Sequence, residues 1–196
     1  MGKRILDASA MLNPVPVVMV SCGDMNDSNI ITVAWTGVLC SEPPMVSISL
    51  RKERLSHEII KRTGEFVINL VNEELVKSCD YCGVKSGRDI NKFDYLKLTR
   101  LKSETVSAPG IEQSPVRLEC KVKNIMEPGS HDIFIAHITA VTVDDTYFDK
   151  NDKFDLSKAE LVCYSHGEYF SLGKKLGFFG YSVASEDVLK RRMQKE

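Results

Sequence analysis

Residues 29–51, NIITVAWTGVLCSEPPMVSISLR, are the stretch around which we expect the fold to be built. The first part, residues 30–36, is rich in β-branched and aromatic side chains and predicts a strand. After Pro43 and Pro44, which interrupt strand pairing, apolar residues alternate with serines over residues 46–50. This alternation predicts a second strand with one polar face. We expect the two strands to pair with each other.

A charged cluster follows the second predicted strand and leads into a predicted helix. Residues 51–54 read RKER, and residues 55–63 have helical character up to Gly64, which is expected as a glycine C-cap. A strand that carries hydroxyl groups and runs into basic residues and a helix N-terminus is suited to binding an anion. Such a charge cluster is also typical of an ordinary solvated turn, so both interpretations stay open at this point.

The composition is that of an ordinary globular protein. The chain has 196 residues, and its 26 basic and 27 acidic side chains give a formal net charge of −1, which gives no indication of nucleic acid as a partner. The N-terminal residues lack the apolar core of a signal peptide, and no run approaches the roughly 20 apolar residues of a membrane span. We therefore expect a cytoplasmic protein with no membrane partner and one domain over residues 1–196.

The remaining pattern predicts a mainly β fold with short helices. Strands are expected over residues 14–22, 65–71, 116–126 and 133–143, the last of them buried on both faces because it has few charges. A second helix is expected from Asn72 as N-cap to about Cys82, ended by Gly83. Residues 83–97 predict a polar loop, and residues 144–160 are expected to be irregular. About six strands with few helices favour a β-barrel over a doubly wound sheet.

Six cysteines are present, and two of them, Cys79 and Cys82, form an isolated CxxC. On a helix this spacing places both thiols on one face. A zinc site would need a second pair of ligands, which the sequence does not show. The favoured interpretation is therefore a pair of buried, reduced thiols, with metal binding or redox sensing as the alternative.

Several segments, in this order and spacing, resemble the flavoredoxin or flavin reductase-like family, which has an FMN-binding split barrel. They are residues 29–35 with Pro43-Pro44, residues 47–51, residues 63–69, residues 86–93 and residues 164–173. The similarity covers nearly the whole chain. The resemblance implies a Greek-key β-barrel, a homodimer, and one FMN per subunit, bound without a covalent link near the dimer interface.

The resemblance also implies four groups of FMN-binding residues. Along the isoalloxazine ring and the ribityl chain it places Asn29, Thr32, Trp35 and Thr36. Around the phosphate it places Ser49, Arg51 and Ser56. Completing the pocket, within the subunit or across the subunit boundary, it places Lys92, Asp94 and His131. Near the ring it places Tyr164. Without the resemblance, Trp35 would be read as a core residue, His131 as a surface histidine, and the basic residues as solvated.

These residue types match what FMN needs from a protein. The phosphate needs cations, hydroxyls and helix N-terminal amides, and the flat ring needs β-branched and aromatic walls. A positive group near the polar edge of the ring, for which His131 and Lys92 are the candidates, would stabilise the reduced flavin. Because the hydride chemistry belongs to the flavin, we expect no catalytic residue and no metal ligand in the protein.

Three functions remain open from the sequence. The leading hypothesis is an FMN flavoprotein of the flavoredoxin type, which transfers electrons and is reduced by NAD(P)H or by a redox protein. The first alternative is an NAD(P)H:flavin reductase that uses FMN as an exchangeable substrate. The second alternative is a non-catalytic barrel that binds metal or senses redox state through Cys79 and Cys82.

Overall fold

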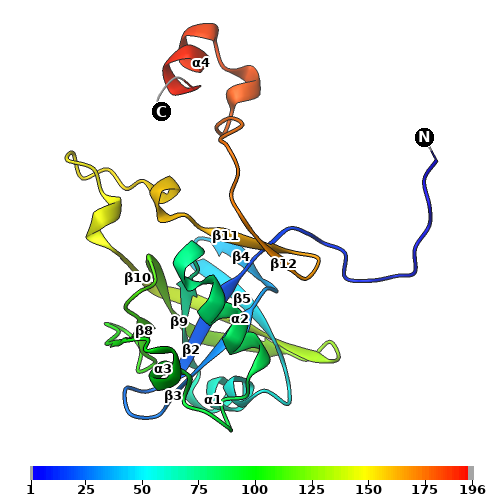
Figure 1. Ribbon diagram of the computed structural model, residues 1–196, viewed down its shortest axis with the longest axis vertical. Helices are drawn as coiled ribbons and strands as arrows, with labels where there is room; N and C mark the ends of the chain where they lie inside the picture. The colour runs from blue at the N-terminus through cyan, green and yellow to red at the C-terminus, as the bar shows by residue number, and fades with distance from the viewer. Residues whose placement is uncertain (1, 194–196) are drawn as a thin grey trace.

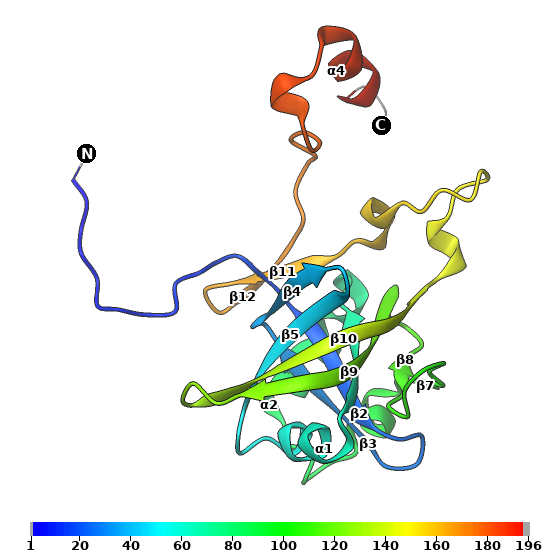
Figure 2. The same ribbon diagram turned by 180° about the vertical axis from the view of Figure 1, so that it is seen from behind.

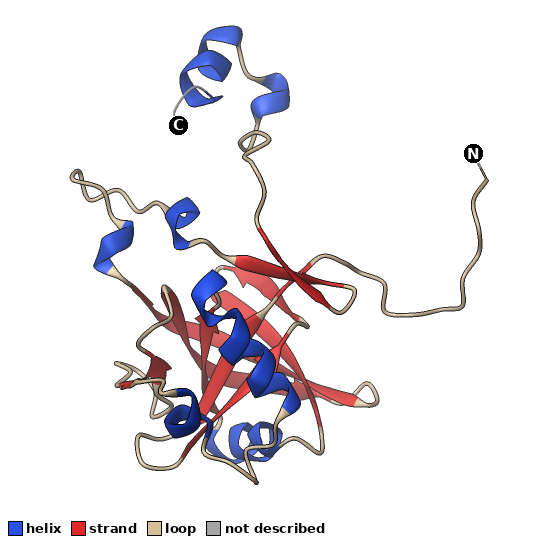
Figure 3. Cartoon of the chain, in the orientation of Figure 1, coloured by secondary structure: helices blue, strands red, loops and turns tan. Residues whose placement is uncertain are grey.

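The chain folds around an antiparallel sheet of seven strands, in the order β3-β2-β6-β9-β10-β5-β4 (Figures 1 and 3). The computed structural model describes residues 2–193. The strands of this sheet are β2 (Val18–Gly23), β3 (Ser28–Val33), β4 (Thr36–Ser41), β5 (Pro44–Arg51), β6 (Glu65–Leu70), β9 (Val116–Met126) and β10 (His131–Val143). With the short helices beside it, the sheet confirms the expected mainly β fold.

The two outer strands of the sheet are consecutive in the sequence. Only Ala34 and Trp35 separate β3, at one edge, from β4, at the other. In a flat sheet these edges would lie about 29 Å apart, since neighbouring strands are about 4.8 Å apart. A two-residue connection spans only about 10 Å. The sheet must therefore curl into an open barrel, and Trp35 lies at its seam.

The structure corrects the expected pairing within residues 29–51. β3 pairs with β2, whereas β5 pairs with β4 on one side and β10 on the other. The predicted pairing of the two strands was wrong because residues 37–41, taken as part of the connection, belong to the edge strand β4. Most side chains of β4 are exposed, so no apolar alternation marks it in the sequence. The prolines belong to the tight β4–β5 turn.

The first helix confirms its predicted boundaries. α1 spans Leu55–Thr63, and Gly64 adopts φ 71° while its N–H donates to the carbonyl of Ile60. Asn72 caps a 3₁₀ turn, η1 (Glu73–Leu75), that leads into α2 (Val76–Val84). Gly83 does not end this helix, contrary to expectation. A Cβ on Gly83 would lie 3.2 Å from the Cβ of Thr32, so glycine here permits close packing of α2 against β3.

Two further expectations need correction. The predicted polar loop over residues 83–97 contains a short helix, α3 (Lys92–Leu96), capped by Asn91, whose side chain accepts from the N–H of Asp94. β10 is not buried on both faces: its side chains alternate between buried and partly exposed over its first half. Few charges in that strand reflect a half-covered outer face rather than complete burial.

Two apolar clusters explain why β2 is buried on both faces. Val18 and Val20 point into the barrel, where they pack among the inward residues of β5 and β6. Met19 faces outward and packs with Cys79 and Phe93, which belong to the helices covering that side. The helices α2 and α3 are therefore held against the outer face of β2 and β3, and their loops form the site described below.

The rest of the chain adds smaller elements and two arms. β1 (Val15–Pro16), β11 (Val162–Ser165) and β12 (Glu168–Ser171) form a three-stranded sheet, and β7 (Arg100–Leu101) pairs with β8 (Gly110–Ile111). Residues 144–160 hold only the 3₁₀ turns η2 (Asp145–Tyr147) and η3 (Leu156–Ala159), as expected. Residues 172–193, with η4 (Tyr181–Val183) and α4 (Glu186–Met193), leave the barrel as an arm, and residues 2–13 leave it as another (Figures 1 and 2).

Within residues 2–193, none of the helices has both the length and the apolar character needed to cross a membrane.

Candidate flavin site

A small cavity lies where three segments meet beside the barrel. They are the start of β3, the N-terminus of α1, and the loop from the end of α2 to α3. The cavity has a volume of about 100 Å³, and its lining residues are Asn29, Ile31, Glu53, Arg54, Leu55, Ser56, Cys82, Lys85, Ser86, Gly87 and Lys92. Three of these residues are cations and one is a carboxylate. The cavity is therefore suited to an anion.

Lys92 is the most buried cation of the cavity, with only 3% of its surface exposed. Its Nζ donates to the carbonyl of Ile30 at 2.7 Å and to the carbonyl of Cys82 at 2.8 Å. Burial lowers the pKa of its ammonium group below the ordinary lysine value. An ammonium group has three donors, and the described residues accept from two of them. The third donor, and the uncompensated buried charge, would both be satisfied by an anion in the cavity.

Asn29 and Ser56 form the polar wall of the cavity. Both are buried, and Nδ2 of Asn29 donates to Oγ of Ser56 at 2.9 Å, which links β3 to the first turn of α1. Gly87 approaches Asn29 so closely that a Cβ there would collide with its carboxamide. A larger residue at this position would therefore have to displace either the loop or the Asn29 carboxamide.

We expect Gly87→Ala to open this loop and to weaken anion binding in the cavity about tenfold, since displacement by a methyl group disturbs one wall while leaving the cations in place. Isothermal titration with FMN measures the effect. Gly129→Ala is the matched control, because a Cβ on Gly129 meets no atom within 4 Å. Equal FMN affinities of the two variants would contradict the role of the close approach.

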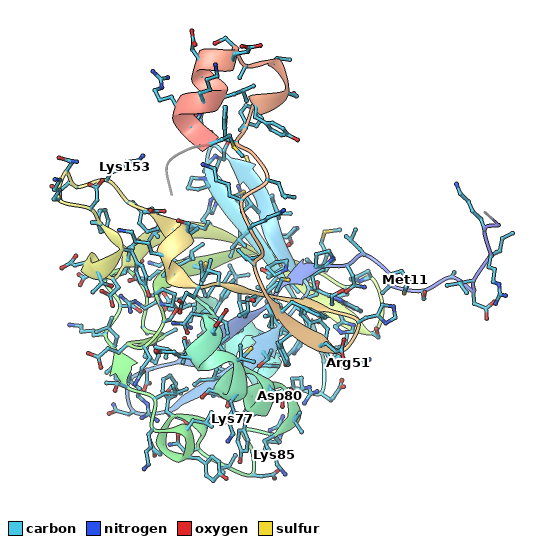
Figure 4. The ribbon with its side chains drawn as sticks, turned by 45° about the horizontal axis from the view of Figure 1, so that its top comes forward. Met11, Arg51, Lys77, Asp80, Lys85 and Lys153 are labelled. Atoms are coloured by element: carbon cyan, nitrogen blue, oxygen red, sulfur yellow. The ribbon has the colours of Figure 1, made fainter. Side chains whose placement is uncertain are left out.

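Arg54 and Lys85 add positive charge at the cavity. Arg54 is the N-cap residue of α1, so its side chain lies next to the amide groups of a helix N-terminus. Lys85 is the residue that follows α2, and Figure 4 labels it together with Lys77 and Asp80 of that helix. Neither residue is among those that the sequence indicates. Both lie in charged segments in which no sequence signal separates a ligand-binding side chain from a solvated one.

A second group of predicted residues lies apart from the cavity, near the seam of the barrel. Trp35 is 49% exposed, and its ring centroid lies 4.7 Å from that of His131. His131 is opposite Arg51 in the β5–β10 register, and the N–H of Ser49 donates to the carbonyl of Trp35 at 2.9 Å. Burial lowers the pKa of His131, and the charge of Arg51 acts in the same direction. Of the three predicted phosphate residues, only Ser56 therefore lines the cavity.

Thr32 and Tyr164 line a separate hollow of about 270 Å³ on the outer side of β3. Its lining residues are Val17, Thr32, Ala34, Asp80, Gly83, Val84, Tyr164 and Tyr169. The rings of Tyr164 and Tyr169 meet edge to face with centroids 5.4 Å apart, and the hydroxyl of Tyr169 donates to Asp80 at 3.1 Å. The last turn of α2 separates this hollow from the cavity, because Cys82 lines one and Gly83 the other.

The two remaining predicted residues have structural contacts. The hydroxyl of Thr36 donates to the carbonyl of Ser47 at 2.8 Å, which holds the β4–β5 hairpin. Asp94 is exposed and forms an ion pair with Arg100 at 2.9 Å. Neither residue lines the cavity or the hollow.

The thiols of Cys79 and Cys82 are buried in the cluster beneath α2, with 0% and 1% of the residue surface exposed. Burial raises the pKa of Cys79 to about 12 and that of Cys82 to about 11, so both thiols are protonated at neutral pH. Metal ligation and thiol exchange require the thiolate. Among residues 2–193 no cluster of three potential metal ligands occurs. The geometry therefore favours the buried-thiol interpretation over metal binding or redox sensing.

A buried hydrogen-bonded pair, His57 and Asp132, fixes the helix that carries Ser56. Nε2 of His57 lies 2.8 Å from Oδ2 of Asp132 on β10, and Nζ of Lys52 lies 3.2 Å from the other oxygen. Burial opposes ionisation of Asp132, but the hydrogen bond from His57 and the ammonium group of Lys52 hold its pKa below the ordinary carboxyl value. The pair joins α1 to the sheet and so positions one wall of the cavity.

We expect Asp132→Asn to lower the free energy of unfolding at pH 7 by about 2 kcal/mol, because it removes the carboxylate charge that His57 hydrogen-bonds and Lys52 pairs with. Since the folded-state pKa of Asp132 is lowered, its contribution is complete above the unfolded-state pKa, near 3.9, and is lost as the pH falls through the lower folded-state value. The difference between wild type and variant should therefore shrink below about pH 4. Urea unfolding at pH 7, 5 and 3.5 measures it, and a difference independent of pH would contradict the assignment.

The comparisons with known proteins agree with this architecture. The sequence profile of the flavin reductase like domain matches residues 10–173. The structure superposes on flavoredoxin of Desulfovibrio vulgaris (Miyazaki F) with a TM-score of 0.85 and 31% identity, covering 93% of this chain and 100% of that one. A flavoredoxin from Methanosarcina acetivorans gives a TM-score of 0.85 at 24% identity, covering 94% and 100%. A protein of Archaeoglobus fulgidus is 29% identical over 171 residues, which are 87% of this chain and 95% of the relative.

A curled antiparallel sheet with an anion cavity beside its helices is thus the split barrel of a redox flavoprotein. The chain belongs to the flavin reductase-like family, as the resemblance in its sequence implies.

Proposed function

We propose that this protein binds FMN without a covalent link and transfers electrons through it, as a flavoprotein of the flavoredoxin type. The observation that carries the proposal is the buried ammonium group of Lys92, which has one donor left for an anion inside a cavity that Arg54 and Lys85 make positive. A phosphate monoester is the anion that this arrangement fits, because it offers several acceptors and two negative charges. The small volume of the cavity suits the single phosphate of FMN.

In this proposal the phosphate occupies the cavity, and the ribityl chain passes over the last turn of α2 so that the ring reaches the hollow lined by Thr32 and Tyr164. Asn29 and Ser56 offer hydrogen bonds to the phosphate and to the adjacent part of the ribityl chain. The tyrosine rings and Val84 offer an apolar wall to the isoalloxazine. The bound flavin would supply the hydride and electron transfer chemistry, and the residues of this chain would bind it, orient it and limit its contact with water.

The residues at the seam between β3 and β4 lie outside the cavity and need a separate role. Trp35, Arg51 and His131 lie on a partly exposed surface rather than in the cavity. We propose that this surface lies at the interface of a homodimer, as the family resemblance implies. There Arg51 would add positive charge at the edge of the flavin site, and the ring of His131 would add a hydrogen-bonding group. The electron donor would be NAD(P)H or a redox protein.

The absorption spectrum of the purified protein tests the proposal. We expect flavin bands, retention of FMN through gel filtration, and bleaching of the bands on reduction with NADH, NADPH or dithionite. A colourless protein that fails to bind added FMN would overturn it. Loss of the flavin on gel filtration, together with NAD(P)H oxidation that depends on free flavin, would instead identify the exchangeable-substrate reductase.

A further inference from the structure

Residues 172–193, here called the C-terminal arm, do not bury their apolar side chains against their own barrel. The arm leaves β12 and extends away from the barrel (Figures 1 and 2). Phe179 is fully exposed, Val183 is 88% exposed and Leu176 is 76% exposed. Within the part of the chain that the structure describes, each hydrogen bond found for residues 173–193 joins two residues of the arm.

The arm is nevertheless a folded element with internal contacts. Nζ of Lys175 donates to the carbonyl of Arg192 at 2.9 Å, and the guanidinium of Arg192 lies 4.0 Å from the centroid of the Phe178 ring. Phe178 in turn meets Tyr181 edge to face. These contacts order the arm while leaving an apolar surface on its outside. Such a surface on a folded element indicates an interaction site.

A matching apolar surface lies on the edge strand β4. Trp35, Val38 and Leu39, here called the β4 patch, are 49%, 75% and 52% exposed. Because β4 is the last strand of the sheet, one row of its backbone groups has no partner in the sheet. An exposed apolar edge strand is a site of association unless another element covers it.

The arm begins beside this patch. Ala34, the neighbour of Trp35, lines the same hollow as Tyr164 and Tyr169, which belong to the hairpin from which the arm leaves. Figure 4 shows the orange arm rising beside the light-blue strands of the β4–β5 hairpin, in agreement with Figures 1 and 2. Arm and patch therefore share one side of the molecule.

We propose that two copies of this chain exchange their C-terminal arms, so that each arm covers the β4 patch of the other subunit. This inference rests on the dimer proposed above and identifies the element that holds it together. Arm and patch lie on the same side of the molecule. A single two-fold axis therefore places the arm of each subunit on the β4 patch of the other subunit. This is the closed arrangement of a symmetric dimer. It also removes the open sheet edge and covers the exposed side of Trp35.

The shared fold supports an ordered role for the arm. The superposition on the Desulfovibrio vulgaris flavoredoxin covers 93% of this chain, which is more than residues 1–171 make up. The match therefore extends into the C-terminal arm. At least part of the arm therefore has a counterpart in a relative of 31% identity.

Light scattering coupled to gel filtration tests the proposal, with Trp35, the only tryptophan of the chain, as a second reporter. We expect the full chain to be a dimer at micromolar concentration. A chain truncated after Leu172 should be a monomer that retains its fold, and its tryptophan emission should shift to longer wavelength because Trp35 becomes exposed. Dilution of the full chain should reproduce that shift as the dimer dissociates.

Point substitutions keep the test valid if the truncated chain does not fold. Leu176→Ser and Phe179→Ser should each weaken dimerisation at least tenfold. Met25→Ser is the control, since Met25 is a partly exposed apolar residue in the β2–β3 turn, away from the arm. A truncated chain that remains a dimer with unchanged emission would overturn the exchange while leaving the dimer intact. An emission shift of the full chain that does not depend on concentration would also overturn the arm exchange. A full chain that is monomeric would overturn both the arm exchange and the dimer itself.

Discussion

Combined substitution of Arg54→Ala and Lys85→Ala will weaken FMN binding about 1,000-fold, because each removes a charge-assisted contact worth about 2 kcal/mol. Neither side chain has an ion-pair partner among residues 2–193. Removing them should therefore leave the fold almost unchanged. Titration of flavin fluorescence against protein measures the affinity at a fixed ionic strength, which matters because exposed charges are screened by salt.

Arg51→Ala is the informative control for this double variant. Arg51 carries the same charge and lies three residues before Arg54, but it is exposed at the end of β5, opposite His131 (Figure 4). If the phosphate occupies the cavity, Arg51→Ala should reduce the affinity by less than tenfold. A larger loss from Arg51→Ala than from the double variant would place the phosphate on the sheet edge instead. Unchanged riboflavin binding in the double variant would show that the lost affinity belongs to the phosphate.

Lys92→Met will lower both the free energy of unfolding and the affinity for FMN. The substitution removes the hydrogen bonds that Nζ donates to the carbonyls of Ile30 and Cys82, which costs about 4 kcal/mol in total. It also removes the buried cation of the cavity. Urea unfolding in the presence and absence of FMN separates the two effects, because a bound ligand adds to the stability of the folded state in proportion to the logarithm of its concentration.

Lys77→Met provides the matched control, since Lys77 is an exposed lysine of α2 with no ion pair among the described residues. It should change neither stability nor affinity. If Lys92→Met were as stable as Lys77→Met, the two hydrogen bonds to backbone carbonyls could not have the role assigned to them. If it lost stability but kept its FMN affinity, Lys92 would be a structural residue only.

The sequence predicts the regular parts of the fold well. α1 and β9 occupy the predicted residues, because an amphipathic helix with a glycine C-cap and a strand with strict alternation have unambiguous local patterns. β4 and α3 were missed for the opposite reason. β4 is exposed on both faces at the edge of the sheet, so its apolar and polar residues do not alternate. α3 has only five residues, which is too short for a helical pattern of apolar residues.

The candidate site was only partly predictable. The resemblance indicated Asn29, Ser56 and Lys92, which the fold brings to one cavity from three separate elements. For the phosphate it indicated Arg51 rather than Arg54, and both belong to one charged cluster. The two arginines differ in position because β5 ends at Arg51, whereas α1 begins directly after Arg54. Arg51 lies in register with β10, whereas Arg54 is the N-cap of α1.

The position of β5 between β4 and β10 has a consequence for how the chain folds. β5 has two partners, β4 nearby in sequence and β10 about 80 residues later. While the chain is being synthesised, one edge of β5 must remain open until β10 leaves the ribosome, and the barrel cannot close before then. Such long-range pairing makes folding slow and leaves intermediates prone to association. We therefore expect refolding to be limited by docking of β10 on β5.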